Sequence, residues 1–224
     1  MWKLIWLAVL MQLAKAPAAP PPAAAPADIV DRMQKFYDQT QDFKADFRQT
    51  LINPVFGRKQ VFDGVVRFKK PGKMRWDYVT PEKKLFISDG KVLWMYEPED
   101  NQAFRQSLAD STLPSAITFL FGQAKLTQEF NITRAEDAAK YGAAGDPVLK
   151  LVPKAPTAHY KHILLDLDPK TGQVKQSFVF DTQGNINQVA FSKVTLNSRI
   201  SDGVFSWSPP AGTKIVKPGQ LGGD

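Results

Sequence analysis

Large apolar side chains recur at every second position in two short runs near the middle of the chain. The first run contains Met74, Trp76 and Tyr78, separated by Arg75 and Asp77. The second run follows an Asp-Gly pair and has the same spacing at Val92, Trp94 and Tyr96. Because successive side chains of a strand point to opposite faces, each run predicts a strand with aromatic residues on one face. An Asp-Gly pair favours a tight hairpin, so we expect the two runs to pair with their aromatic side chains side by side.

The same period of two predicts strands along most of the remaining chain. Turn-forming residues separate several of these strands, as at 168–172 and 181–185. Two segments have helical features instead: 28–40, where apolar residues recur at helical spacing, and 113–122, which begins with a proline and ends with a glycine. The pattern therefore predicts a mainly β fold of the α+β class, with a single antiparallel sheet of roughly ten strands and two helices.

The first 27 residues differ in composition from the rest. Leu4 to Ala14 is almost entirely apolar but has only about half the ~20 residues that a membrane-spanning helix needs. A short charged start followed by such a run is typical of a secretory signal peptide, and the Ala/Pro tract at 16–27 is typical of an extended spacer. We therefore expect export from the cytoplasm, one folded domain at 28–218, and a flexible tail at 219–224.

Charge and cysteine content exclude several classes of function. The net charge of +7 is modest, and the densest basic cluster (Lys69, Lys70, Lys73 and Arg75) is typical of a solvated strand edge, so nucleic-acid binding is not expected. The chain contains no cysteine, which excludes disulfides, thiolate metal sites and a lipid-attachment cysteine.

Catalytic motifs are also absent from the sequence. It has no Gly-x-Ser-x-Gly elbow, phosphate-binding loop, dinucleotide fingerprint or His-Glu-x-x-His motif. The two histidines, His159 and His162, would point to opposite faces of a strand, which is unsuited to a shared metal ion. We therefore expect neither an enzyme nor a cofactor.

An aromatic wall of this breadth must be covered, and the predicted helices are small covers for it. A partly closed barrel with a hollow interior is one arrangement, and a well-filled core is the other. The pattern alone leaves both open.

Several motifs together resemble the periplasmic outer-membrane lipoprotein carriers (LolA-like proteins), over about residues 29–217. The motifs that carry this resemblance are Phe43-x-Ala45-x-Phe47-x-Gln49, the segment from Phe68 through Pro71-Gly72 to Tyr78, Pro81, Ser88-Asp89-Gly90-Lys91-x-Leu93-Trp94-x-Tyr96, the 114–121 helix, the turns at 168–172 and 181–184, and Phe205-Ser206-Trp207-Ser208-Pro209-Pro210-x-Gly212.

The resemblance implies an unclosed β-barrel whose concave apolar face is covered by a helical lid. It also implies a monomeric periplasmic protein that takes acylated lipoproteins from an inner-membrane ABC transporter and delivers them to an outer-membrane acceptor. Related folds sense envelope stress or carry other lipids, so an envelope sensor or scaffold is the alternative function.

Site residues follow from the resemblance and the alternation together. The expected lining of the acyl-chain cavity is Phe47, Phe68, Trp76, Tyr78, Trp94 and Tyr96. The expected lid residues are Met33, Phe36, Ile117, Leu120 and Phe121. In the family, the lid is fastened by a basic residue, commonly arginine, just before the proline of the second strand turn. Here that position is Lys70, and lysine lacks the planar guanidinium group of arginine.

Overall fold

A computed structural model describes residues 27–109 and 126–216 of the chain. In chain order, its helices, 3-10 helices (η) and strands are α1 Ala27–Gln39, β1 Asp42–Asn53, β2 Arg58–Lys69, β3 Lys73–Thr80, β4 Lys84–Asp89, β5 Val92–Glu97, β6 Gln102–Ser107, α3 Leu126–Glu129, β7 Phe130–Arg134, η1 Ala138–Lys140, β8 Val148–Pro153, β9 His162–Leu167, β10 Val174–Phe180, β11 Ile186–Leu196, η2 Asp202–Phe205 and β12 Lys214–Val216. The predicted helix at 28–40 is confirmed as α1, whereas the one at 113–122 lies outside the described residues.

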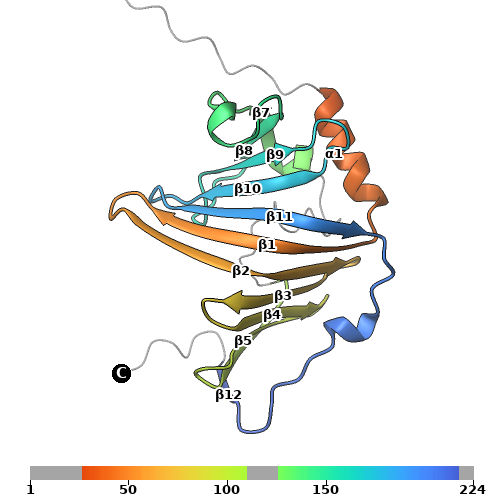
Figure 1. Ribbon diagram of the computed structural model, residues 1–224, viewed down its shortest axis with the longest axis vertical. Coiled ribbons are helices and arrows are strands. Elements are labelled where there is room, and N and C mark those ends of the chain that lie inside the picture. Colours follow the sequence, from red (N-terminus) through yellow and green to blue (C-terminus); the bar gives the residue numbers. More distant parts are fainter. Residues whose placement is uncertain (1–26, 110–125, 217–224) are drawn as a thin grey trace, which may run out of the picture.

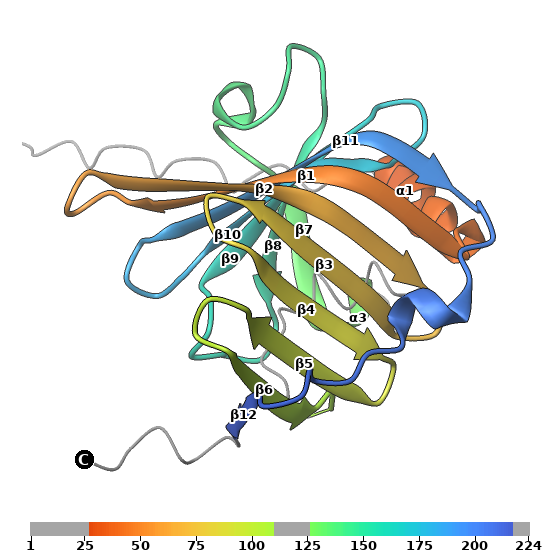
Figure 2. The same cartoon turned by 60° about the horizontal axis from the view of Figure 1, so that its bottom comes forward.

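The strands of the described residues form one sheet in the order β12-β6-β5-β4-β3-β2-β1-β11-β10-β9-β8-β7 (Figure 1). The sheet is strongly curved, and its outermost strands β7 and β12 do not pair, so it remains an unclosed barrel (Figure 2). The mainly β fold class is confirmed. The expectation of a purely antiparallel sheet is wrong at one edge, where β12 pairs parallel to β6 because the chain first crosses to the far edge of the sheet after β11.

The predicted pairing of the two aromatic runs, 74–78 and 92–96, is wrong, because the strand β4 lies between them. This strand pairs with β3 on one side and with β5 on the other, so β3 and β5 are not neighbours. Trp76 lies opposite Phe86, and Phe86 lies opposite Met95. Met95 therefore shares the face of Trp76, and the residues on either side of Met95 point to the other face.

The concave face holds two adjoining apolar clusters. In one, α1 packs Ile29, Met33 and Tyr37 against apolar side chains of β8 and β9. The other is the aromatic cluster on β1, β2, β3 and β11. The opposite, convex face carries a smaller cluster around Phe178, which packs against Tyr141 of the segment that contains η1. No helix of the described residues is long and apolar enough to cross a membrane.

Candidate functional site

The aromatic wall of the concave face is built on three neighbouring strands. Phe47, Phe68 and Trp76 are each less than 10% exposed, and Tyr78 is partly buried beside them. The ring of Phe47 lies edge-on to Trp76 at 4.8 Å and to Tyr78 at 4.9 Å, measured between ring centroids. Phe68 contacts Trp76 in the same way at 5.6 Å. Four of the six residues predicted to line a cavity are thus brought together on one face.

Gly64 of β2 provides the space that Phe47 occupies. It pairs directly with Phe47, and a Cβ at this position would lie 2.7 Å from the Phe47 ring and 2.1 Å from the carbonyl oxygen of Asp77. The β2–β3 register also shifts next to Gly64. A glycine is therefore required here for the Phe47 ring to occupy this position.

Trp94 and Tyr96 do not belong to this wall, and their predicted place on it is wrong. Both lie on the convex face, where Trp207 covers them with centroid distances of 5.5 Å and 5.2 Å. The cause is the intervening strand β4, whose pairing puts Ile87 opposite Trp94 and Leu85 opposite Tyr96.

The helix α1 covers part of the concave face with two of the predicted lid residues. Met33 is 1% exposed within the cluster under the helix, and Phe36 packs against the same cluster. A small enclosed space of about 10 Å³ lies between the end of α1 and the wall, lined by Tyr37, Thr40, Phe43, Phe68 and Phe191. The other predicted lid residues, Ile117, Leu120 and Phe121, lie outside the described residues.

Lys70 joins the end of α1 to the sheet. Its Nζ donates to the carbonyl oxygen of Tyr37 and, at 3.4 Å, to that of Asp38. Carbonyls in the last turn of a helix lack intrahelical partners, and a cation there is stabilised by the helix dipole. Burial lowers the pKa of Lys70, and the charge of Asp38 acts in the opposite direction.

The concave face becomes polar along β1. Phe43, Ala45 and Phe47 are followed on the same face by Gln49, Leu51 and Asn53. Tyr78 Oη donates to Gln49 Oε1 at 2.8 Å, and Gln49 Nε2 donates to Asn187 Oδ1 at 3.0 Å. This chain of hydrogen bonds crosses β3, β1 and β11 at the boundary of the aromatic wall.

The pKa of Tyr78 reports how far its phenol is buried at this boundary. Burial raises it from 10.0 to about 12. Because the folded pKa exceeds the unfolded one, the neutral phenol stabilises the fold fully below pH 10, and this stabilisation is lost as the pH rises towards 12. We expect the alkaline difference titration between the wild-type protein and Tyr78→Phe to show one phenolate appearing near pH 12, with circular dichroism verifying that both remain folded. A phenolate appearing near pH 10 would contradict the burial of Tyr78.

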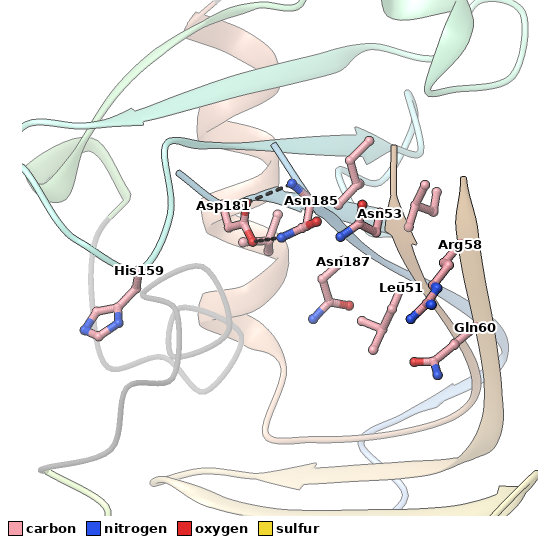
Figure 3. Close-up of a pocket in the computed structure, with 11 residues that line it drawn as sticks. Leu51, Asn53, Arg58, Gln60, His159, Asp181, Asn185 and Asn187 are labelled. Carbon is pink, nitrogen blue, oxygen red and sulfur yellow. Dashed lines mark hydrogen bonds between the residues drawn. The ribbon is translucent and has the colours of Figure 1, made fainter. Parts of the chain in front are cut away.

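Beyond this boundary lies an open cleft of about 590 Å³ (Figure 3). It is formed between the β1–β2 hairpin and the β10–β11 hairpin, with His159 at its side, and it is lined by Leu51, Ile52, Asn53, Arg58, Gln60, His159, Val179, Asp181, Asn185, Ile186 and Asn187. Asp181 holds the amide of Asn185 at 2.6 Å. Sequence reasoning missed this cleft, although the continued alternation Gln49-x-Leu51-x-Asn53 signals a face that changes from apolar to polar.

Side chains that could hold a metal ion are not gathered in the described residues. The described part of the chain contains no group of three or more His, Asp or Glu residues able to hold a metal ion. His159 lines the cleft, whereas His162 stacks on Phe180 at 4.3 Å on the convex side of β9. The arrangement is suited to binding an amphipathic molecule.

Comparison with known proteins agrees with this architecture. The family described as outer membrane lipoprotein carrier protein LolA matches residues 38–208. An outer-membrane lipoprotein carrier protein of Dechloromonas aromatica is 28% identical over 195 residues, which cover 87% of this chain and 90% of that protein. One of Chromobacterium violaceum is 28% identical over 207 residues, covering 92% and 96%.

A solved structure shares the fold. An uncharacterized conserved protein from Thermus thermophilus superposes with a TM-score of 0.52 at 11% identity, covering 85% of this chain and 98% of that one. The family match spans most of the chain and includes the strands that carry the aromatic wall and the polar cleft. The chain therefore belongs to the outer membrane lipoprotein carrier (LolA) family.

Proposed function

We propose that this protein is a periplasmic carrier that binds the acyl chains of lipoproteins against its concave face and takes them from the inner to the outer membrane. One observation carries the proposal: a single face changes from aromatic at Phe43 and Phe47 to polar at Gln49 and Asn53. An acylated protein likewise changes from apolar acyl chains to a polar polypeptide along its length. Its acyl chains would lie on the wall, and its polar amino-terminal segment in the open cleft.

The energetics explain why a carrier is needed. Each methylene removed from water contributes about 0.8 kcal/mol, so exposing a chain of about sixteen carbons costs about 12 kcal/mol. A soluble carrier must cover this surface and still release it. Aromatic rings suit both requirements, because they offer a large contact area with few directional bonds to break.

The helix α1 would act as part of the lid in this proposal. It packs directly over the cluster that adjoins the wall, so acyl chains could enter beneath it only if it moves. The partners of the protein would be an inner-membrane ABC transporter that loads the cargo and an outer-membrane acceptor that receives it. Family membership and the names of its relatives support these roles.

Site-specific photo-crosslinking tests where the cargo binds. Benzoyl-phenylalanine at Tyr78 would stand at the end of the wall, and the same group at Tyr96 would stand on the convex face as a matched control. We expect irradiation in the periplasm of lipoprotein-producing cells to yield an acylated adduct, identified by mass spectrometry, from position 78 and not from position 96. Equal labelling from both positions, or a stable protein partner in place of acylated species, would refute the proposal.

The contact made by Lys70 leads to a quantitative prediction. We expect Lys70→Ala to lower the free energy of unfolding by about 1 kcal/mol, because α1 loses the cation at its carbonyl end. Amides of α1 should exchange hydrogen faster, and lipoprotein should be released more readily. Lys69→Ala is the matched control, since Lys69 contacts Ile200 and Asp202 instead. Unchanged loading and release in Lys70→Ala would show that the lid is fastened elsewhere.

A further inference from the structure

The β1–β2 hairpin projects beyond its neighbours in the sheet (Figures 1 and 2). On one side β3 pairs with β2 only as far as Asp63, and on the other side β11 pairs with β1 as far as Ile52. Only the last hairpin pair, Asn53–Arg58, and the turn at 54–57 therefore extend beyond both neighbouring strands. At the tip of the hairpin, Val55 is 76% exposed and Phe56 is 73% exposed. Two adjacent large apolar side chains are thus held in solvent at the outermost point of the hairpin.

The tip has a defined shape. The side chain of Asn53 accepts a hydrogen bond from the backbone N–H of Phe56 at 3.0 Å. The guanidinium of Arg58 lies over the Phe56 ring, 5.9 Å from its centroid. These local contacts orient the apolar tip without burying it.

Basic side chains lie directly behind the tip, on both faces of the hairpin. Arg58 pairs with Asn53 and points to the concave face, and Lys59 pairs with Ile52 and points to the convex face. No acidic residue occurs between Asp46 and Asp63. The projecting end therefore combines an apolar tip, Val55 and Phe56, with the basic side chains of Arg58 and Lys59 behind it.

We propose that this hairpin inserts its tip, Val55 and Phe56, into the surface of an anionic phospholipid bilayer. Gly57 alone separates Phe56 from Arg58, and the Arg58 guanidinium lies 5.9 Å from the centroid of the Phe56 ring. That spacing lets Arg58 and Lys59 meet lipid phosphates while the ring enters the boundary between headgroups and acyl chains. A stable protein partner typically covers about 800 Å² of each surface, which a two-residue tip does not supply.

Insertion would have a geometric consequence for the carrier. Arg58 and Gln60 of the same hairpin line the open cleft at the end of the concave face. Insertion of the hairpin tip would place the open cleft close to the membrane surface. Only this consequence depends on the proposed carrier function, because binding of the tip to lipid requires no cargo.

Vesicle binding of the purified protein tests the proposal. Protein exported and processed by a Gram-negative host, with its N-terminus determined, is mixed with phosphatidylethanolamine vesicles that contain or lack phosphatidylglycerol. We expect binding to the anionic vesicles that weakens at high salt. Val55→Ser with Phe56→Ser should weaken binding by about tenfold or more, and Arg58→Gln with Lys59→Gln by about fivefold for each charge removed. Val152→Ser with Ile215→Ser, two exposed aliphatic residues elsewhere, is the matched control and should bind normally.

A label at the tip separates insertion from general adhesion. Because the chain contains no cysteine, Phe56→Cys and Val152→Cys each give one site for an environment-sensitive fluorophore. Only the label at position 56 should shift to shorter wavelength on anionic vesicles. The proposal is overturned if the wild-type protein does not bind anionic vesicles, if the Val55/Phe56 variant binds as well as the wild type, or if the two labels respond alike. Lipoprotein crosslinking at Tyr78 is measured separately, so failure of vesicle binding leaves the carrier proposal standing.

Discussion

Replacing Asp42 by alanine is expected to lower the free energy of unfolding by about 4 kcal/mol, because its carboxylate organises the chain after β11. Asp42 is only 4% exposed. One carboxylate oxygen accepts from the backbone N–H and hydroxyl of Ser198 at 2.8 Å and 3.0 Å, and the other accepts from the N–H groups of Arg199 and Ile200 at 2.9 Å and 3.3 Å. Alanine leaves all four donors without this partner.

Urea unfolding followed by circular dichroism measures the effect. Asp181→Ala is the matched control, because this carboxylate also accepts backbone N–H bonds, from Gln183 and Asn185, but in a surface turn. We expect it to cost about 1 kcal/mol, since water replaces the lost acceptor. Asp42→Asn should fall between the two, as it retains one acceptor oxygen. Equal losses for Asp42→Ala and Asp181→Ala would show that the loop donors are satisfied by water.

The aromatic wall could be predicted from sequence in strands whose alternation of apolar and charged residues is compatible with only one assignment of faces. At the wall the inward positions of β3 are large and apolar and the outward ones are charged, as in Met74-Arg75-Trp76-Asp77-Tyr78. A slip of one residue would have placed charges in the core. Phe47, Phe68, Trp76 and Tyr78 therefore share a face as predicted.

The misplacement of Trp94 and Tyr96 arose in β4, where alternation is ambiguous. Leu85 and Ile87 are buried on the convex side, and Phe86 is partly buried on the concave side. A strand that is apolar on both faces gives no signal of which face is which. The prediction therefore paired the two aromatic runs directly, whereas the turn at 89–90 pairs β5 with β4.

Other features of the site depend on segments that are distant in sequence. The cleft forms between two hairpins about 130 residues apart in sequence, so no local pattern predicts it. The contact of Lys70 with α1 likewise depends on where the helix lies, which the helical period leaves open. Local patterns specify faces, whereas the docking of elements requires the tertiary structure.

The middle of α1 packs closely against Gly172 in the β9–β10 turn, and Gly172→Ala is expected to lower the free energy of unfolding by about 3 kcal/mol. Gly172 has a φ of +78°, and a Cβ there would lie 2.6 Å from the backbone nitrogen of Met33 and 2.8 Å from the carbonyl carbon of Arg32. Both atoms belong to the backbone of α1, so the helix or the turn must shift. Arg32 also donates to the carbonyl oxygen of Pro169 in the same turn.

Gly145→Ala separates the helix contact from the strain of the backbone. Gly145 has a similar φ of +89°, but nothing lies within 4 Å of its added Cβ, so we expect a loss of only about 1 kcal/mol. The difference of about 2 kcal/mol between the stability losses of the two variants measures the close packing of α1 against the turn. If α1 covers bound acyl chains, Gly172→Ala should also release crosslinkable lipoprotein faster than Gly145→Ala does. Equal stability losses in the two variants would show that the turn yields and the helix stays in place, and equal release would remove α1 from the lid.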